Sequence, residues 1–126
     1  MGQKILLVED EPDTLKMFKE ILESEGYEVA PATNGEEALA IINGYIPDLI
    51  VLDIMLPGIS GIDVAKKLAE RNEVKNIPIV VVTALDNIPL GSDNISGLTG
   101  IRRFIFKPCR PKTLLEGIKD ALTYKH

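Results

Sequence analysis

The sequence LIVLDIMLPG at residues 49–58 gives the clearest indication of the fold. Its first four residues are aliphatic and end at Asp53, and Pro57 and Gly58 mark a loop shortly afterwards. A short aliphatic run bounded by turn-forming residues is typical of a parallel strand that is buried on both faces. The stretch therefore predicts a central strand with a carboxylate at its carboxyl end.

Three further runs have the same form. Each is a short apolar segment that stops at side chains able to bind a metal ion or a phosphate: residues 5–8 at Glu9 and Asp10, 79–82 at Thr83, and 104–106 at Lys107. In an open parallel sheet, ligands bind outside the carboxyl ends of the strands. These side chains, far apart in the sequence, should therefore converge in one crevice.

Helical patterns alternate with these strands. Pro12 suits the first position of a helix with apolar residues at helical spacing, and Gly26 is typical of its end. A weak strand pattern follows at residues 27–30. Asn34 then predicts the cap of a second helix, with Glu37 completing a near match to a capping box. This alternation predicts an α/β domain with a parallel sheet and helices on both faces.

Two more helices are expected, from about residue 62 to 71 and from near Pro111 onward. The segment 85–100 does not fit the alternation, because it contains one proline, three glycines and several other turn formers. A short helix around residues 92–98 is the most that this composition allows. The fourth helix of the domain is therefore expected to be short or irregular.

Composition narrows the class of protein. The chain has 126 residues, 45% of them hydrophobic, and a net charge of −5, which argues against direct nucleic-acid binding. Cys109 is the only cysteine, so no intrachain disulfide is possible, as is usual in a reducing cytoplasm. No apolar run approaches the roughly 18 residues that cross a bilayer. We expect a cytoplasmic domain without a membrane segment.

The three carboxylates at the strand ends carry a specific chemistry. Glu9, Asp10 and Asp53 should repel one another strongly unless a cation relieves them, and a cluster of oxygen ligands suits Mg²⁺. Magnesium uses one or two carboxylates, which leaves another free to attack phosphorus and form an aspartyl phosphate. Lys107 and Thr83 would supply a cation and a hydroxyl donor for the transferred phosphoryl oxygens.

Taken together, these motifs resemble the response-regulator receiver domain of two-component signalling. The resemblance rests on four segments: ILLVEDEP at 5–12, LDIMLPGISG at 52–61, VTA at 82–84 and FKP at 106–108. It covers essentially the whole chain, with 85–100 as the weakest part. It implies a flavodoxin-like (βα)5 fold with strand order 2-1-3-4-5, and a single receiver domain over residues 1–126.

The resemblance also implies a role for each acidic position. Asp53 matches the aspartate that takes a phosphoryl group from a histidine kinase or a histidine phosphotransfer protein. Asp10 matches the residue that binds Mg²⁺ directly, and Glu9 its neighbour that often acts through water. The backbone carbonyl of Met55 matches a further metal ligand.

The same resemblance assigns the switch. Thr83 matches the hydroxyl that moves toward the phosphoryl group, and Lys107 matches the lysine that pairs with it. Phe104 matches the switch aromatic, with ordinary strand core as the alternative reading. The bond between Lys107 and Pro108 is expected to be cis.

Competing functions remain open at this point. A Mg²⁺-dependent phosphatase with Asp53 as nucleophile usually has a second acid nearby, but Ile54 and Met55 follow here, and 126 residues leave no room for a large cap. A flavodoxin-like binder would need a phosphate-binding loop after the first strand, and this sequence has none there. The complete acidic set argues against a module that only docks partners. We therefore expect a signalling domain, not an enzyme, that dephosphorylates itself slowly.

The expected partners follow from the same reading. His126 is the only histidine, so the phosphodonor histidine should lie on another protein. The downstream output partner is not specified by these residues. We expect a monomer or a weak homodimer.

Overall fold

The computed structural model describes residues 2–84 and 100–123. The short or irregular helix that was expected around residues 92–98 lies outside these described residues. The strands are β1 (Lys4–Val8), β2 (Glu28–Ala32), β3 (Leu49–Leu52), β4 (Ile79–Thr83) and β5 (Ile101–Phe106). The helices are α1 (Pro12–Ser24), α2 (Gly35–Ile42), α3 (Gly61–Ala69) and α4 (Pro111–Thr123).

The five strands form one parallel sheet in the order β2-β1-β3-β4-β5, which confirms the predicted topology. Every residue of β3 and β4 is buried, and β1 exposes only Lys4, as expected for central strands with helices on both faces. Val8 pairs with Leu52 in the register of β1 and β3. Glu9 and Asp53, the next residues of these neighbouring strands, therefore leave the sheet side by side.

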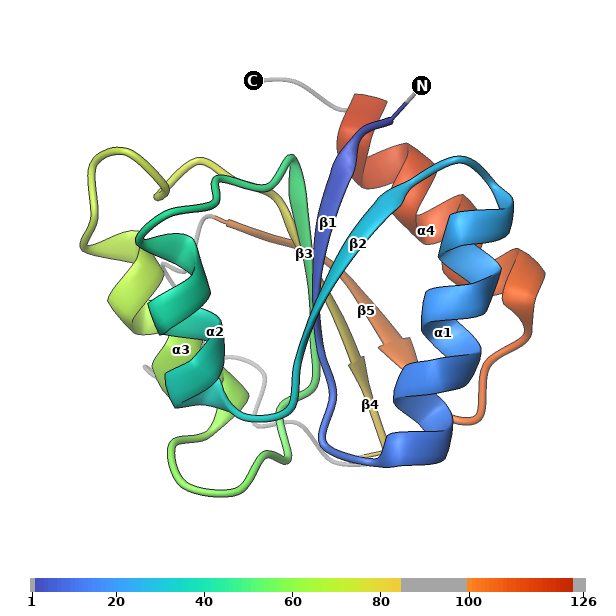
Figure 1. Ribbon diagram of the computed structural model, residues 1–126, viewed down its shortest axis with the longest axis horizontal. Coiled ribbons are helices and arrows are strands. Elements are labelled where there is room, and N and C mark those ends of the chain that lie inside the picture. The colour runs from blue at the N-terminus through green and yellow to red at the C-terminus, as the bar shows by residue number, and fades with distance from the viewer. Residues whose placement is uncertain (1, 85–99, 124–126) are drawn as a thin grey trace.

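Helices cover both faces of the sheet (Figure 1). One core cluster, which includes Leu6 and Ile50, packs beneath α2 and α3. The other, which includes Ile5 and Val51, packs beneath α1 and α4. Neighbouring residues of a strand join opposite clusters because side chains alternate across a strand. The apolar runs of the sequence therefore fill two cores, one on each face of the sheet.

The ends of α1 and α2 largely follow the sequence expectation. Pro12 is the first residue of α1, and Gly26 follows its end with a φ of 91°. Asn34 caps α2 by accepting a hydrogen bond from the backbone N–H of Glu37. The expected return bond is displaced by one residue, because the Glu37 carboxylate accepts from the backbone N–H of Thr33 at 2.6 Å.

Three elements differ in extent from the expectation, and one of them is β2, which covers Glu28–Ala32 instead of residues 27–30. The helix α3 ends at Ala69 instead of Arg71, and its first turn carries a complete capping box of Ser60 and Asp63. The strand β5 begins at Ile101, three residues before its apolar run. Arg103 extends from this early part of β5 to an ion pair with Asp120 of α4, at 2.8 Å.

Candidate functional site

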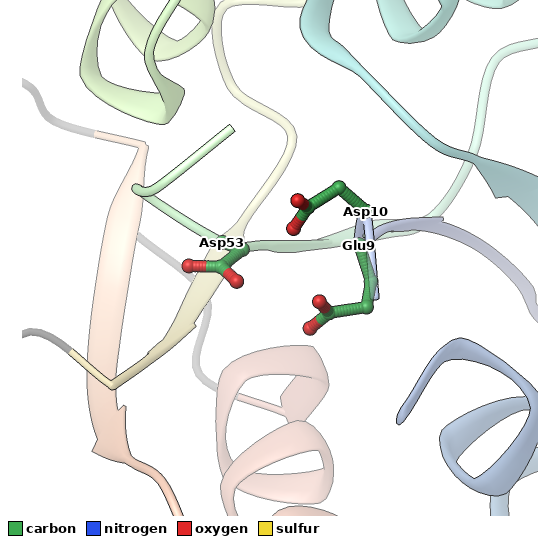
Figure 2. Close-up of side chains that lie close together, drawn as sticks. All are labelled: Glu9, Asp10 and Asp53. Carbon is green, nitrogen blue, oxygen red and sulfur yellow. The ribbon is translucent and has the colours of Figure 1, made fainter. Parts of the chain in front are cut away.

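Three carboxylates meet at the carboxyl edge of the sheet. One oxygen from each of Glu9, Asp10 and Asp53 lies within 4.8 Å of the others. Figure 2 shows Glu9 and Asp10 projecting from the end of β1 toward Asp53, which follows β3. Glu9 and Asp53 are buried, whereas Asp10 is exposed. The structure thus brings together the three acids that the sequence singled out.

Glu9 is held at both of its oxygens. Its Oε2 accepts a hydrogen bond from the backbone N–H of Glu11 at 3.0 Å, and its Oε1 accepts one from the Lys107 ammonium. Burial raises the pKa of Glu9 above its usual value of 4.5, and the charge of Asp53 adds to that rise. The bonds from Lys107 and Glu11 lower the pKa without cancelling the effect of burial. Ionisation of Glu9 in the folded protein therefore costs more free energy than ionisation of an exposed glutamate.

Lys107, which follows the edge strand β5, connects two of the carboxylates. Besides its bond to Glu9, its ammonium donates to Oδ2 of Asp53 at 3.0 Å, and its side chain is only 17% exposed. Burial alone would lower the pKa of Lys107, but the hydrogen bonds and charges of the two carboxylates outweigh it and raise the pKa. The peptide bond between Lys107 and Pro108 is cis, as expected.

Asp53 is also fixed at both oxygens. Its Oδ1 accepts a hydrogen bond from the backbone N–H of Met55 at 3.1 Å, while Oδ2 accepts from Lys107. The Asp53 backbone N–H donates to the carbonyl of Val8 at 3.1 Å, which ties it to β1. The Met55 side chain is exposed. The role of the Met55 carbonyl as a metal ligand stays a prediction.

Thr83 and Phe104 lie at the positions where a switch was expected, but in a packed environment. Thr83 ends β4 and is fully buried, and its carbonyl accepts a hydrogen bond from the Lys107 backbone N–H at 2.8 Å. Phe104 is half-buried and packs against the core beneath α2 and α3. Their movement on phosphorylation stays a prediction.

The charges of the cluster leave a deficit that a cation can fill. Three carboxylates face one ammonium, so two negative charges remain when all are ionised. All the atoms of the cluster that could coordinate a metal ion are carboxylate oxygens, which suit a hard divalent cation. The site can therefore bind such an ion and, with it, a phosphate group.

A largely apolar groove adjoins this site. It encloses about 260 Å³ between the start of α1 and the segment after β5. Its lining residues are Thr14, Met17, Phe18, Ala84, Lys107, Pro108 and Cys109. A larger cavity of about 400 Å³, lined by Arg102, Arg103 and Asp120, lies at the opposite end of β5. Of these two hollows, the first shares Lys107 with the acidic site and the second shares none of its residues.

Comparisons with known proteins agree with this geometry. The response regulator receiver domain family matches residues 5–119. The chain is 35% identical over 122 residues to the polar-differentiation response regulator DivK of Brucella anthropi, which covers 97% of this chain and 98% of the relative. The chain therefore belongs to the response-regulator receiver family.

Solved structures show the same likeness. The chemotaxis response regulator CheY4 of Vibrio cholerae superposes with a TM-score of 0.87 at 29% identity, covering 97% of this chain and 100% of that one. The response regulator TrrA of Thermotoga maritima, whose structure is a complex with Mg²⁺–BeF, superposes with a TM-score of 0.81 at 33% identity, covering 95% and 99%.

Membership of this family decides between the functional classes that the sequence left open. The chain is a receiver domain of two-component signalling, a class that interacts with kinases and output partners. The phosphatase and docking-only alternatives are not favoured. Within the described ranges, none of the helices combines the length and apolar character needed to cross a membrane.

Sequence reasoning missed three features of the site. It assigned Lys107 to the phosphoryl group but not to Glu9, because no local pattern reports a contact across 98 positions. It overlooked Glu11, whose carboxylate caps α1 by accepting from the backbone N–H groups of Asp13 and Thr14. It also overlooked the box of Ser60 and Asp63, although serine followed three residues later by an acid is its known signature.

Proposed function

We propose that Asp53 is the phosphoacceptor of this receiver domain, and that Mg²⁺ held by the acidic cluster assists the transfer. The observation that carries this proposal is the meeting of three carboxylates within 4.8 Å, two of them bonded to Lys107. Phosphoryl transfer depends mainly on positioning and on neutralising charge, and this arrangement offers both.

The choice of Asp53 as nucleophile follows from its position. Glu9 and Asp53 are both buried and both bonded at each oxygen, but only Asp53, at the end of β3, matches the acceptor position of the receiver family. Asp10 is exposed at the rim and suits direct metal binding. An Asp53 carboxylate oxygen attacks the phosphorus of a phosphohistidine, the phosphorus–nitrogen bond breaks, and the imidazole leaves with the bonding electrons. Water later attacks the same phosphorus, releasing phosphate and restoring the carboxylate slowly.

The metal would be held by Asp10 and Asp53 directly, by Glu9 through water, and by the carbonyl of Met55. When bound, Mg²⁺ supplies positive charge opposite the phosphoryl oxygens. Lys107 would supply a second positive charge to the phosphoryl oxygens, since its ammonium already lies 3.0 Å from Oδ2 of Asp53. The acceptor would then have two cationic groups near its carboxylate.

The switch is proposed to begin at Thr83. Its hydroxyl would donate to a phosphoryl oxygen, and Phe104 would fill the space that Thr83 leaves. The proximity of both residues to the end of β4 supports this coupling, because Val81, two residues before Thr83, pairs with Phe104. Phosphorylation adds charge at Asp53 and so biases a two-state surface.

We further propose that residues 1–126 form one receiver domain, that its donor is a histidine kinase or a histidine phosphotransfer protein, and that it signals without enzymatic turnover of small substrates. The apolar groove beside Lys107 supports docking of a partner next to the acceptor.

The net charge of −5 and the free Cys109 support a cytoplasmic domain that binds neither nucleic acid nor membrane. It would be a monomer or a weak homodimer.

The proposal is tested by phosphorylation with acetyl phosphate. Incubation with Mg²⁺ should add one phosphoryl group to the wild-type chain, as measured by intact mass and located at Asp53 by fragmentation. The adduct should be absent from Asp53→Asn and from samples with chelator, and present in the control Asp48→Asn, which lies at the other end of the sheet. An equal adduct on Asp53→Asn would contradict the assignment.

A further inference from the structure

Gly61, the first residue of α3, packs directly against the backbone of the acceptor. A Cβ atom placed on Gly61 would meet the carbonyl oxygen of Asp53, and would lie 2.7 Å from the Cα atom of Ile54 and 2.9 Å from the carbonyl carbon of Asp53. All three are backbone atoms, so no side-chain rotation can relieve the overlap. The close approach therefore requires glycine for its lack of a side chain.

Backbone hydrogen bonds hold this contact in place. The Gly61 N–H donates to the Ile54 carbonyl at 2.9 Å, and the Leu56 N–H donates to the same oxygen at 3.1 Å. On the opposite side, the Asp53 N–H donates to Val8 of β1. The acceptor's peptide is thus held between β1 and the first turn of α3.

The first turn of α3 is itself well anchored. Ser60 Oγ accepts from the Asp63 N–H at 3.1 Å, and the Asp63 carboxylate accepts from the Ser60 N–H at 3.4 Å. Val64 and Leu68 bury the inner face of the helix in the core. The turn that contacts Asp53 is therefore held in place by its capping box and by the packing of α3 against the core.

We propose that Gly61 is a positioning residue, which sets the place of the Asp53 carboxylate relative to Asp10 and Lys107. This inference rests on the proposed function of Asp53. Restoring ordinary van der Waals separation after adding a methyl group moves the two backbones apart by on the order of 1 Å. A misplacement of about that size at a reacting group costs roughly 10²-fold in rate.

Gly117 offers a matched control. It is a buried glycine of α4, and a Cβ atom there would lie 2.8 Å from Cδ1 of Ile105, the flexible end of a side chain. Gly117→Ala therefore introduces a similar overlap in a helix, but it meets no backbone and lies away from the acceptor. Comparing the two alanine variants separates positioning from general packing.

The experiment measures the rate of phosphorylation by acetyl phosphate at saturating Mg²⁺. For Gly61→Ala, the maximal rate should fall roughly 10²-fold, while the acetyl phosphate concentration at half-saturation stays the same. Gly117→Ala should keep the wild-type rate. Equal rates in the two variants would overturn the inference. A wild-type chain that is not phosphorylated at all would overturn the proposed function, and this inference with it.

A second pair of variants decides the matter if Gly61→Ala does not fold, as judged by circular dichroism. Ser60→Ala removes the cap and should slow phosphorylation by a few-fold, because the supporting turn loosens. Ser60→Asp supplies another capping oxygen and should restore the rate. A wild-type rate in Ser60→Ala, or no recovery in Ser60→Asp, would overturn the inference.

Discussion

The two ends of the sheet carry similar polar groups under opposite conditions. At the amino end, the Lys4 N–H donates to Asp48 at 2.7 Å, the Tyr45 hydroxyl donates to Glu28 at 3.5 Å, and the Lys4 ammonium lies 5.4 Å from the centre of the Tyr45 ring. Lys4, Glu28 and Asp48 are exposed, and Tyr45 is half-buried. Water screens such contacts, which contribute little to stability.

At the carboxyl end, the same kinds of groups are removed from water. The side chains of Glu9 and Asp53 are 3% and 6% exposed, and Lys107 bridges them. Burial of a carboxylate is costly unless it is well paired. The carboxyl end therefore holds buried charge that a bound cation can neutralise, whereas the amino end holds ordinary surface contacts.

The largest effect is expected from Asp10→Asn. Loss of this exposed carboxylate removes a proposed direct metal ligand, so Mg²⁺ affinity should fall by at least roughly tenfold, because loss of an outer-shell partner alone costs about that much. Titration calorimetry of the purified variant measures the change. The control Asp48→Asn removes a carboxylate at the amino end and should bind Mg²⁺ like the wild type. Equal affinities in the two variants would remove the distinction between the ends.

Lys107→Ala should destabilise the metal-free fold by about 1–3 kcal/mol, because it leaves Glu9 buried without its cation. The variant should still bind Mg²⁺, since all three carboxylates remain, but its conformation should respond poorly to phosphorylation. Urea unfolding with and without Mg²⁺ measures the first effect, and amide NMR the second. A stability loss no larger than that of Lys4→Ala would count against the pairing.

Acidification should weaken Mg²⁺ binding before an ordinary glutamate would protonate. The pKa of Glu9 is raised above 4.5 by burial, so Glu9 takes up a proton as the pH falls through that higher value. Metal binding competes with this proton. Affinity measured between neutral pH and pH 4.5 should therefore fall, and Glu9→Gln should flatten the dependence. A constant wild-type affinity over this window would contradict the prediction.

In the absence of metal, the raised pKa of Glu9 should make the fold more stable, not less, as the pH falls. A raised carboxyl pKa means that ionised Glu9 disfavours the fold, a cost absent below pH 4.5 and complete above the folded-state pKa. The contribution of Glu9 to the free energy of unfolding should thus improve on acidification through this window. Comparison of urea unfolding in wild type and Glu9→Gln isolates that contribution.

The smallest effect on stability is expected from a substitution at the amino end of the sheet. Tyr45→Phe removes the 3.5 Å contact to Glu28, and we expect the free energy of unfolding to change by no more than about 0.5 kcal/mol. Thermal unfolding measures it. A loss comparable to that of Lys107→Ala would show that exposure does not separate the two ends.

Much of this arrangement could be predicted from the sequence, because strands and the edge they share follow from local patterns. The apolar runs before Glu9, Asp53 and Thr83 located the central strands and the acidic cluster. The cis bond at Pro108 came from the family resemblance. The alternation of strands and helices also indicated the two helical layers.

The rest depends on contacts that no local pattern records. The early start of β5 was missed because Arg102 and Arg103 interrupt the apolar signal. The bond from Lys107 to Glu9 and the approach of Gly61 to Asp53 arise only when separate elements pack together. Thr83 was expected in the crevice of the acidic residues, and the sequence did not indicate that tertiary packing buries it fully.

NMR spectra of a ¹⁵N-labelled sample, titrated with Mg²⁺ and then with beryllofluoride, show where the cation and the phosphoryl group bind. Amide signals of Asp10, Asp53 and Lys107 should shift with saturation, while those of Glu28 and Asp48 stay still. Saturable shifts at the amino end, or none at the carboxyl end, would contradict a single cation and phosphoryl site at the ends of β1, β3 and β5.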